Sequence, residues 1–107
     1  MLLEYYVSTA LLDLRRLRML EGRIVLNATL DKMNLASDAL NEVRGAWERV
    51  RPTLAASDPD GLATFEDSLS AQRTALDQRD RLALATCARQ AIATINGMQG
   101  LPYAARE

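Results

Sequence analysis

Apolar residues in the first thirty positions recur with a seven-residue repeat, as in an amphipathic helix. Two neighbouring heptad columns form one apolar side, interrupted by Glu21, and their members are Leu3, Val7, Ala10, Leu14, Leu17, Ile24 and Ala28. A further column lies almost opposite, and its members are Tyr5, Leu12, Met19 and Leu26. A helix that is apolar on two sides is normally buried on two sides. The pattern therefore predicts one long helix over residues 2–30, continuous through Gly22, that packs on a core and on something else.

Three later segments each show a single apolar seam at helical spacing. The first seam comprises Ala36, Leu40, Val43, Trp47, Val50 and Leu54. The second comprises Leu62, Phe65, Leu69 and Leu76, with Gln72 interrupting it. The third comprises Leu84, Ala88, Ala91, Ile95 and Met98, flanked by Cys87 and Ile92. Four helices with one shared core predict an all-α, up-down four-helix bundle in a single domain over residues 1–107.

Polar residues and prolines predict where these helices begin and bend. The candidate N-caps are Asn34, Asp58 and Asp80. Pro59 suits the first helical position after Asp58, whereas Pro52 should kink or thin the last turn of the second helix. The sequence around Leu30-Asp31 weakly resembles that around Leu76-Asp77, which is consistent with two helical hairpins.

The end of the fourth helix is predicted from its helix-breaking residues. Gly97 and Gly100, followed by Pro102, should stop this helix and leave a loosely ordered tail.

Composition narrows the classes of function. The net charge is -1, whereas dedicated nucleic-acid-binding domains usually carry a strong basic excess, so no nucleic-acid partner is expected. No stretch reaches the roughly 18 uninterrupted apolar residues of a membrane span. The single cysteine, Cys87, forms no internal disulfide and is expected to be a buried, inert thiol. The N-terminus lacks a basic region followed by an apolar core, so no intact signal peptide is expected. A cytoplasmic location is slightly favoured, and the alternative is an exported mature domain whose signal or anchor has been removed.

The chain contains no histidine, which removes several kinds of chemistry at once. Nucleophile–histidine catalysis, haem ligation by histidine and the usual zinc sites all need that residue. A calcium loop starting at Asp58 would need Gly at its sixth position and Glu at its twelfth, but Ala63 and Leu69 stand there. We therefore expect no catalytic residue, no metal site and no cofactor, and hence no enzyme.

Charged residues on the first helix leave two interpretations open. Arg15, Arg16 and Arg23, together with Arg18, form a cluster that could bind a carboxylate or phosphate. The simpler interpretation is a solvated face that pairs with Asp13, Glu21 and the acidic face of the third helix. Glu21 itself should be paired, with Arg18 three residues earlier, or should lie where the bundle opens to solvent; a catalytic role is the less favoured alternative.

Two functions from different classes follow. The first is a non-enzymatic interaction or sensor/adaptor module that self-associates, most simply as a homodimer, or binds another helical protein. Its interface would be Tyr5, Leu12, Met19 and Leu26. The second is a bundle that binds a small anionic or apolar molecule, with Arg15, Arg16 and Arg23 at the mouth of its site.

Overall fold

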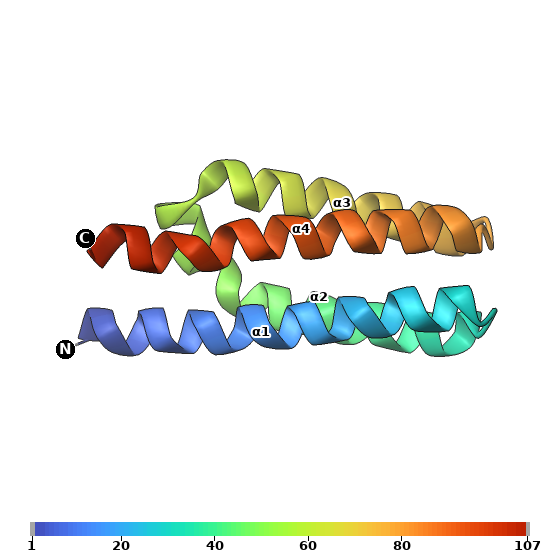
Figure 1. Ribbon diagram of the computed structural model, residues 1–107, viewed down its shortest axis with the longest axis horizontal. Coiled ribbons are helices and arrows are strands. Elements are labelled where there is room, and N and C mark those ends of the chain that lie inside the picture. Colours follow the sequence, from blue (N-terminus) through green and yellow to red (C-terminus); the bar gives the residue numbers. More distant parts are fainter. Residues whose placement is uncertain (1, 107) are drawn as a thin grey trace.

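Four α-helices make up the protein, whose computed structural model describes the backbone of residues 2–106 and the side chains of residues 12–98. They are α1 (Leu2–Thr29), α2 (Met33–Ser57), α3 (Pro59–Asp77) and α4 (Arg81–Arg106). Successive helices run in opposite directions, and α1 begins at the end of the bundle where α4 finishes (Figure 1). The predicted all-α four-helix bundle is confirmed, and α1 passes through Gly22 without a break.

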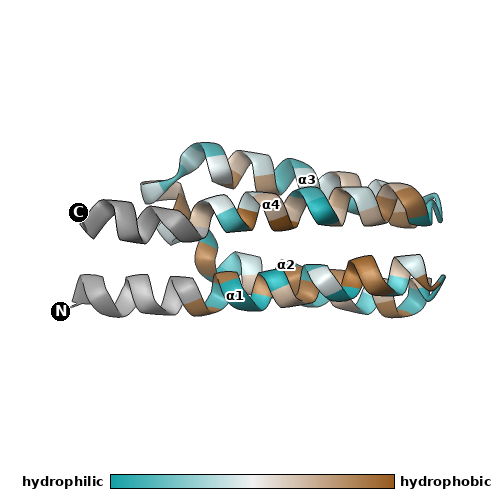
Figure 2. Cartoon of the chain, in the orientation of Figure 1, coloured by the Kyte–Doolittle hydropathy of each residue, from teal (hydrophilic) through white to brown (hydrophobic). Residues whose placement is uncertain are grey.

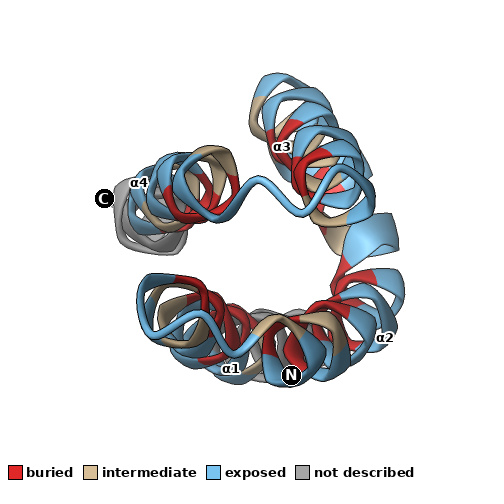
Figure 3. Ribbon diagram, turned by 90° about the vertical axis from the view of Figure 1, so that its right-hand side faces the viewer, coloured by how far each residue is buried: buried red, intermediate tan, exposed pale blue. Residues whose placement is uncertain are grey.

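The core lies between the four helices, which turn their buried residues towards one another (Figure 3). Every described member of the predicted seams of α1, α2 and α4 is buried. Leu20 of α1 is also buried, although it belongs to neither predicted column. The α3 seam is less complete, since Phe65 is fully buried whereas Leu62, Leu69 and Leu76 are only partly buried.

Packing between the helices is uneven. The most extensive contacts join α1 to α2, α1 to α4 and α3 to α4, whereas α2 and α3 share fewer contacts. The rings of Trp47 on α2 and Phe65 on α3 bridge that sparser side, with centroids 4.3 Å apart and planes inclined by 33°. Trp47 is only 2% exposed, so the expectation of a large core side chain is confirmed. The bundle is therefore two hairpins, α1–α2 and α3–α4, joined mainly along α1 and α4.

Both hairpin turns have the same backbone geometry. After α1, Asp31 has a φ of 59°, the Lys32 N–H donates to the Asn27 carbonyl and the Asp31 N–H donates to the Ala28 carbonyl. This is a Schellman motif, in which a residue in the left-handed conformation turns the chain so that the N–H groups after the helix bond its last carbonyls.

The turn after α3 repeats this motif. Arg79 has a φ of 54°, the Asp80 N–H donates to the Ala75 carbonyl and the Arg79 N–H to the Leu76 carbonyl. The two turns therefore align Asp31 with Arg79. The sequence similarity between Leu30-Asp31 and Leu76-Asp77 suggested an alignment that differs from this one by two residues.

The predicted helix starts are partly confirmed. Asp58 accepts a hydrogen bond from the Gly61 N–H at 3.0 Å, Pro59 opens α3, and Asp80 accepts from the Ala83 N–H at 3.1 Å. The prediction of Asn34 as a cap is wrong, because α2 already begins at Met33 and its N-cap is Lys32, which makes no side-chain cap. The Schellman turn ends at Lys32 and leads directly into α2, so the helix starts before Asn34.

One residue, Asp58, separates α2 from α3. The α2 helix continues past Pro52 to Ser57. Figure 1 shows this last part of α2 turning away from α1 towards the start of α3. The bend expected at Pro52 thus lies where the chain crosses from one hairpin to the other.

The prediction that α4 stops at Gly97–Pro102 is wrong, since the helix continues to Arg106. Over the described backbone, no glycine has a positive φ. A glycine costs a helix only about 1 kcal/mol and does not forbid helical backbone angles. Pro102 removes one N–H donor, which lowers stability without excluding a helix. The segment predicted as a loose tail is consequently part of α4.

Hydrophobic residues recur along all four helices and form no single long block (Figure 2). In the described part of the chain, no helix is both long enough and apolar enough to cross a membrane.

Candidate functional site

A row of large apolar side chains runs along the outer side of α1. Leu12, Met19 and Leu26 are 63%, 51% and 57% exposed, although their neighbours Leu14, Leu17 and Ile24 are buried. Leu30, which is 54% exposed, continues the row beyond the helix end. We call Leu12, Met19 and Leu26 the outer row. Tyr5, the fourth member of the predicted interface, lies outside the residues whose side chains are described.

The outer row is symmetric about its own centre. Leu12 and Leu26 each lie seven residues from Met19. At about 1.5 Å of rise per residue, the row extends about 21 Å along the helix. Two copies of this surface can therefore meet in antiparallel orientation, with Met19 against Met19 and Leu12 against Leu26 of the second copy. Self-complementarity of this kind is what a two-fold interface requires.

Arg15, Arg16 and Arg23 are all exposed on α1, beside the outer row. No ion pair within the described part of the chain involves any of these three. Of the expected partners, Asp13 lies 3.6 Å from Arg49 of α2 instead and Glu21 is buried. On the acidic face of α3, Glu66 lies 3.5 Å from Arg51 and Asp77 lies 3.6 Å from Arg73. The exposure of these three arginines agrees with the solvated face of the simpler interpretation, but the expected pairing with Asp13 and Glu21 is not formed among the described residues. Their binding of an anion stays a prediction.

Glu21 lies at the centre of the bundle with no exposed surface. The expectation that it faces an opening to solvent is therefore wrong. Its Oε1 accepts a hydrogen bond of 3.1 Å from Nε2 of Gln72, which is also fully buried. This bond links α1 to α3, the two helices that lie diagonally across the core. Burial away from water raises the pKa of Glu21 from 4.5 to about 8, and the bond to Gln72 offsets part of that rise.

Two unpaired oxygens in this contact indicate the protonation state of Glu21. Oε2 of Glu21 and Oε1 of Gln72 are both buried and have no hydrogen-bond partner among the described residues. A carboxylate can only accept, so an ionised Glu21 leaves both oxygens unsatisfied. A protonated Glu21 carries an O–H, and this group can donate to the free Oε1 of Gln72. At neutral pH the pair is therefore a neutral carboxylic acid facing a primary amide.

Sequence reasoning did not find this partner of Glu21. Glu21 and Gln72 were each recognised as a polar interruption of an otherwise apolar seam. Buried polar groups almost always pair, so two such interruptions facing one core were a signal that they pair with each other. That inference needed only the position of α3 diagonally opposite α1.

No group of three or more potential metal ligands occurs among the described residues. Comparison with protein-family models finds no family that matches the chain, and searches of curated proteins and of solved structures find no significant match either. The candidate functional features are therefore the outer row, the Glu21–Gln72 pair and the surfaces between the helices.

Proposed function

We propose that the chain is a non-enzymatic interaction module that self-associates through the outer row of α1, forming a two-fold antiparallel homodimer suited to a sensor or adaptor role. The observation that carries the proposal is the row itself, three large apolar side chains that are each more than half exposed in the monomer. Large exposed apolar side chains that line one side of a helix are typical of an interface. The equal spacing of Leu12 and Leu26 about Met19 lets two copies pack antiparallel, which is why we propose a second copy as the partner.

Charges at the rim of this dimer determine how its affinity depends on salt concentration. In a pairing centred on Met19, Arg16 of one copy lies beside Arg23 of the second copy, because these two residues flank the outer row on the same side and lie at nearly the same height. These guanidinium groups repel each other at low ionic strength, and salt screens the repulsion within about 10 Å at 0.1 M. The dimer should therefore become tighter as salt is added. An acidic partner docked on the same arginines would bind more weakly in salt.

The first experiment measures oligomeric state by analytical ultracentrifugation at about 50 μM protein, a concentration suited to micromolar dissociation constants. The wild type should sediment as a dimer, and the double variant Leu12→Glu with Met19→Glu as a folded monomer. Leu82→Glu with Thr86→Glu is the matched control, since it adds the same charge at exposed positions of α4 and should stay dimeric. A monomeric wild type at this concentration refutes the proposal.

A second experiment tests the geometry of the dimer. Arg16→Glu replaces two repulsive contacts with two Glu–Arg pairs, so the dimer should tighten several-fold at low salt. Arg15→Glu is the control, since Arg15 flanks the outer row on the other side, where Gly22 of the second copy faces it. A dimer that weakens on Arg16→Glu, or that weakens as salt is added, is not the antiparallel one proposed.

A further inference from the structure

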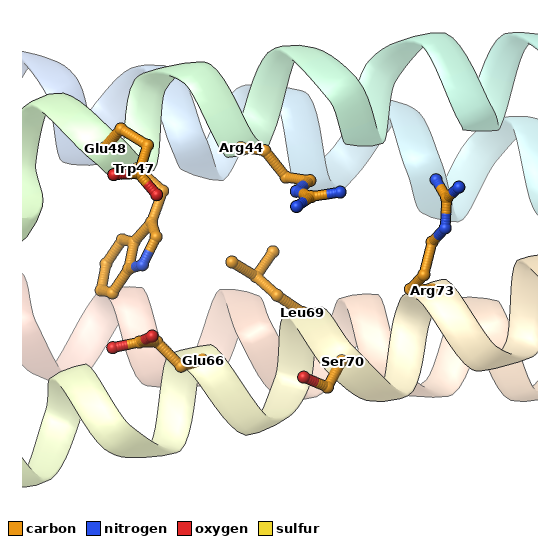
Figure 4. A pocket seen from close by; sticks show the side chains of 7 residues that line it. All are labelled: Arg44, Trp47, Glu48, Glu66, Leu69, Ser70 and Arg73. Atoms are coloured by element: carbon orange, nitrogen blue, oxygen red, sulfur yellow. The ribbon is translucent and has the colours of Figure 1, made fainter.

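A groove of about 410 Å³ lies between α2 and α3, on the sparser side of the bundle. Trp47 and Leu69 give it an apolar part, and Ser70 adds a hydroxyl group (Figure 4). Arg15, Arg16 and Arg23 are not among its lining residues, so it is separate from the anion site predicted on α1.

The charged residues of the groove are sorted by sign along its length. Figure 4 shows Glu48 and Glu66 at one end and Arg44 and Arg73 at the other, with α2 and α3 contributing one residue to each end. The separation of the two ends follows from helix geometry. Arg44 and Glu48 are four residues apart on α2 and Glu66 and Arg73 seven apart on α3, which gives about 6 Å and about 10 Å of rise.

Each end retains charge that the bundle does not neutralise. Within the described residues Arg44 and Glu48 form no ion pair. Arg73 lies 3.6 Å from Asp77, and Glu66 lies 3.5 Å from Arg51. Both of these pairs are substantially exposed to solvent, and exposed pairs contribute little. The groove therefore has a basic end and an acidic end that are both available to a ligand.

The indole N–H of Trp47 is a further donor at this site. It is buried and has no hydrogen-bond acceptor within the described chain. In Figure 4 its nitrogen lies on the edge of the ring that faces Leu69 and the basic end. A buried donor without an acceptor is rare in folded proteins. An oxygen atom placed between this edge and Arg44 would satisfy both groups.

We propose that this groove binds an elongated zwitterion, whose carboxylate lies between Arg44, Arg73 and the indole N–H of Trp47 and whose ammonium group lies between Glu48 and Glu66. The spacer between its charges would lie on Trp47 and Leu69. A linear ω-amino acid and a short peptide with free ends share this chemistry, with charges about 6–10 Å apart. The proposal is independent of self-association, since the groove uses no residue of the outer row.

Trp47 is the only tryptophan of the chain, so its fluorescence reports on the groove directly. Titration with 6-aminohexanoate should change this fluorescence, and hexanoate and hexylamine, which each lack one charge, should bind at least tenfold more weakly. Triglycine is titrated in parallel. Tighter binding of triglycine indicates a peptide ligand, and tighter binding of 6-aminohexanoate indicates an aliphatic spacer.

Variants inside and outside the groove distinguish binding in the groove from a general effect of charge on the ligand. Arg44→Gln and Glu48→Gln should each weaken 6-aminohexanoate binding about tenfold, as expected for the loss of one hydrogen-bonded charge. Arg16→Gln and Glu42→Gln make the same changes at exposed positions outside the groove and should leave binding unchanged. The proposal is overturned if neither fluorescence nor saturation-transfer NMR detects either zwitterion at about 10 mM. Equal binding of hexanoate or hexylamine overturns it as well.

Discussion

Glu21 makes the stability of the bundle depend on pH in a range where few other groups titrate. Its pKa is 4.5 in an ordinary environment and about 8 in the folded chain. Between these values the unfolded chain loses the proton while the folded chain retains it. The folded state then binds more protons, so the free energy of unfolding falls as pH rises. This contribution is complete below pH 4.5 and is lost as the pH approaches 8.

The size of the effect follows from the same two values. Each pH unit between them costs about 1.4 kcal/mol, so the whole loss is about 5 kcal/mol. Between pH 5.5 and pH 7.5 the expected loss is about 2.5 kcal/mol. Ordinary aspartates and glutamates are already ionised at about pH 5.5, and the chain has no histidine. The loss in this window is therefore attributable to Glu21.

Urea unfolding followed by circular dichroism and Trp47 fluorescence measures this free energy at each pH and at one protein concentration. Glu21→Gln keeps the shape of the side chain and supplies an N–H donor towards Gln72 but cannot ionise. Its free energy of unfolding should be nearly constant across the window, and it should exceed that of the wild type at pH 7.5. Glu42→Gln is the matched control, because Glu42 is exposed and its variant should follow the wild type. Parallel profiles for wild type and Glu21→Gln would show that Glu21 is ionised in the folded core, contrary to this reasoning.

Two further predictions concern the turns. Arg79→Gly should raise the free energy of unfolding by about 1 kcal/mol, because glycine adopts a φ of 54° without the strain of a Cβ. Thermal unfolding measures this change in stability, and a variant less stable than the wild type would contradict the reasoning. Asp58→Ala should lower it by about 1 kcal/mol through loss of the cap on the Gly61 N–H. Asp60→Ala, in the same first turn but outside that hydrogen bond, should have a smaller effect, and equal losses would rule out capping as the cause.

Helix content and the core seams were predictable because both are encoded locally. Every described seam residue of α1, α2 and α4 is buried as its spacing indicates. The caps at Asp58 and Asp80 were predictable for the same reason, since each bonds an N–H three residues later. The α4 end was not, because Gly97 and Gly100 lower helix propensity without deciding whether a helix continues.

Features that depend on contacts between distant residues were harder to predict. Glu21 and Gln72 are 51 positions apart, so their pairing follows only from the arrangement of the helices. The groove needs the same knowledge, because Arg44 and Arg73 come together only through the antiparallel α2 and α3. The outer row, in contrast, was predictable from the sequence, since exposure on α1 follows from helical periodicity once the core side is known.

The single-residue junction at Asp58 has a mechanical consequence. It ties α2 to α3 beyond the acidic end of their groove, and the extensive contact between α1 and α4 closes the opposite side of the bundle. The easiest deformation is then a rotation of one hairpin against the other about the α1–α4 contact, with little displacement near Asp58. Movement should increase with distance from the junction, towards the start of α2 and the end of α3. The basic end of the groove, at Arg44 and Arg73, would therefore open more widely than the acidic end, so the ends of a bound molecule would enter in a fixed order.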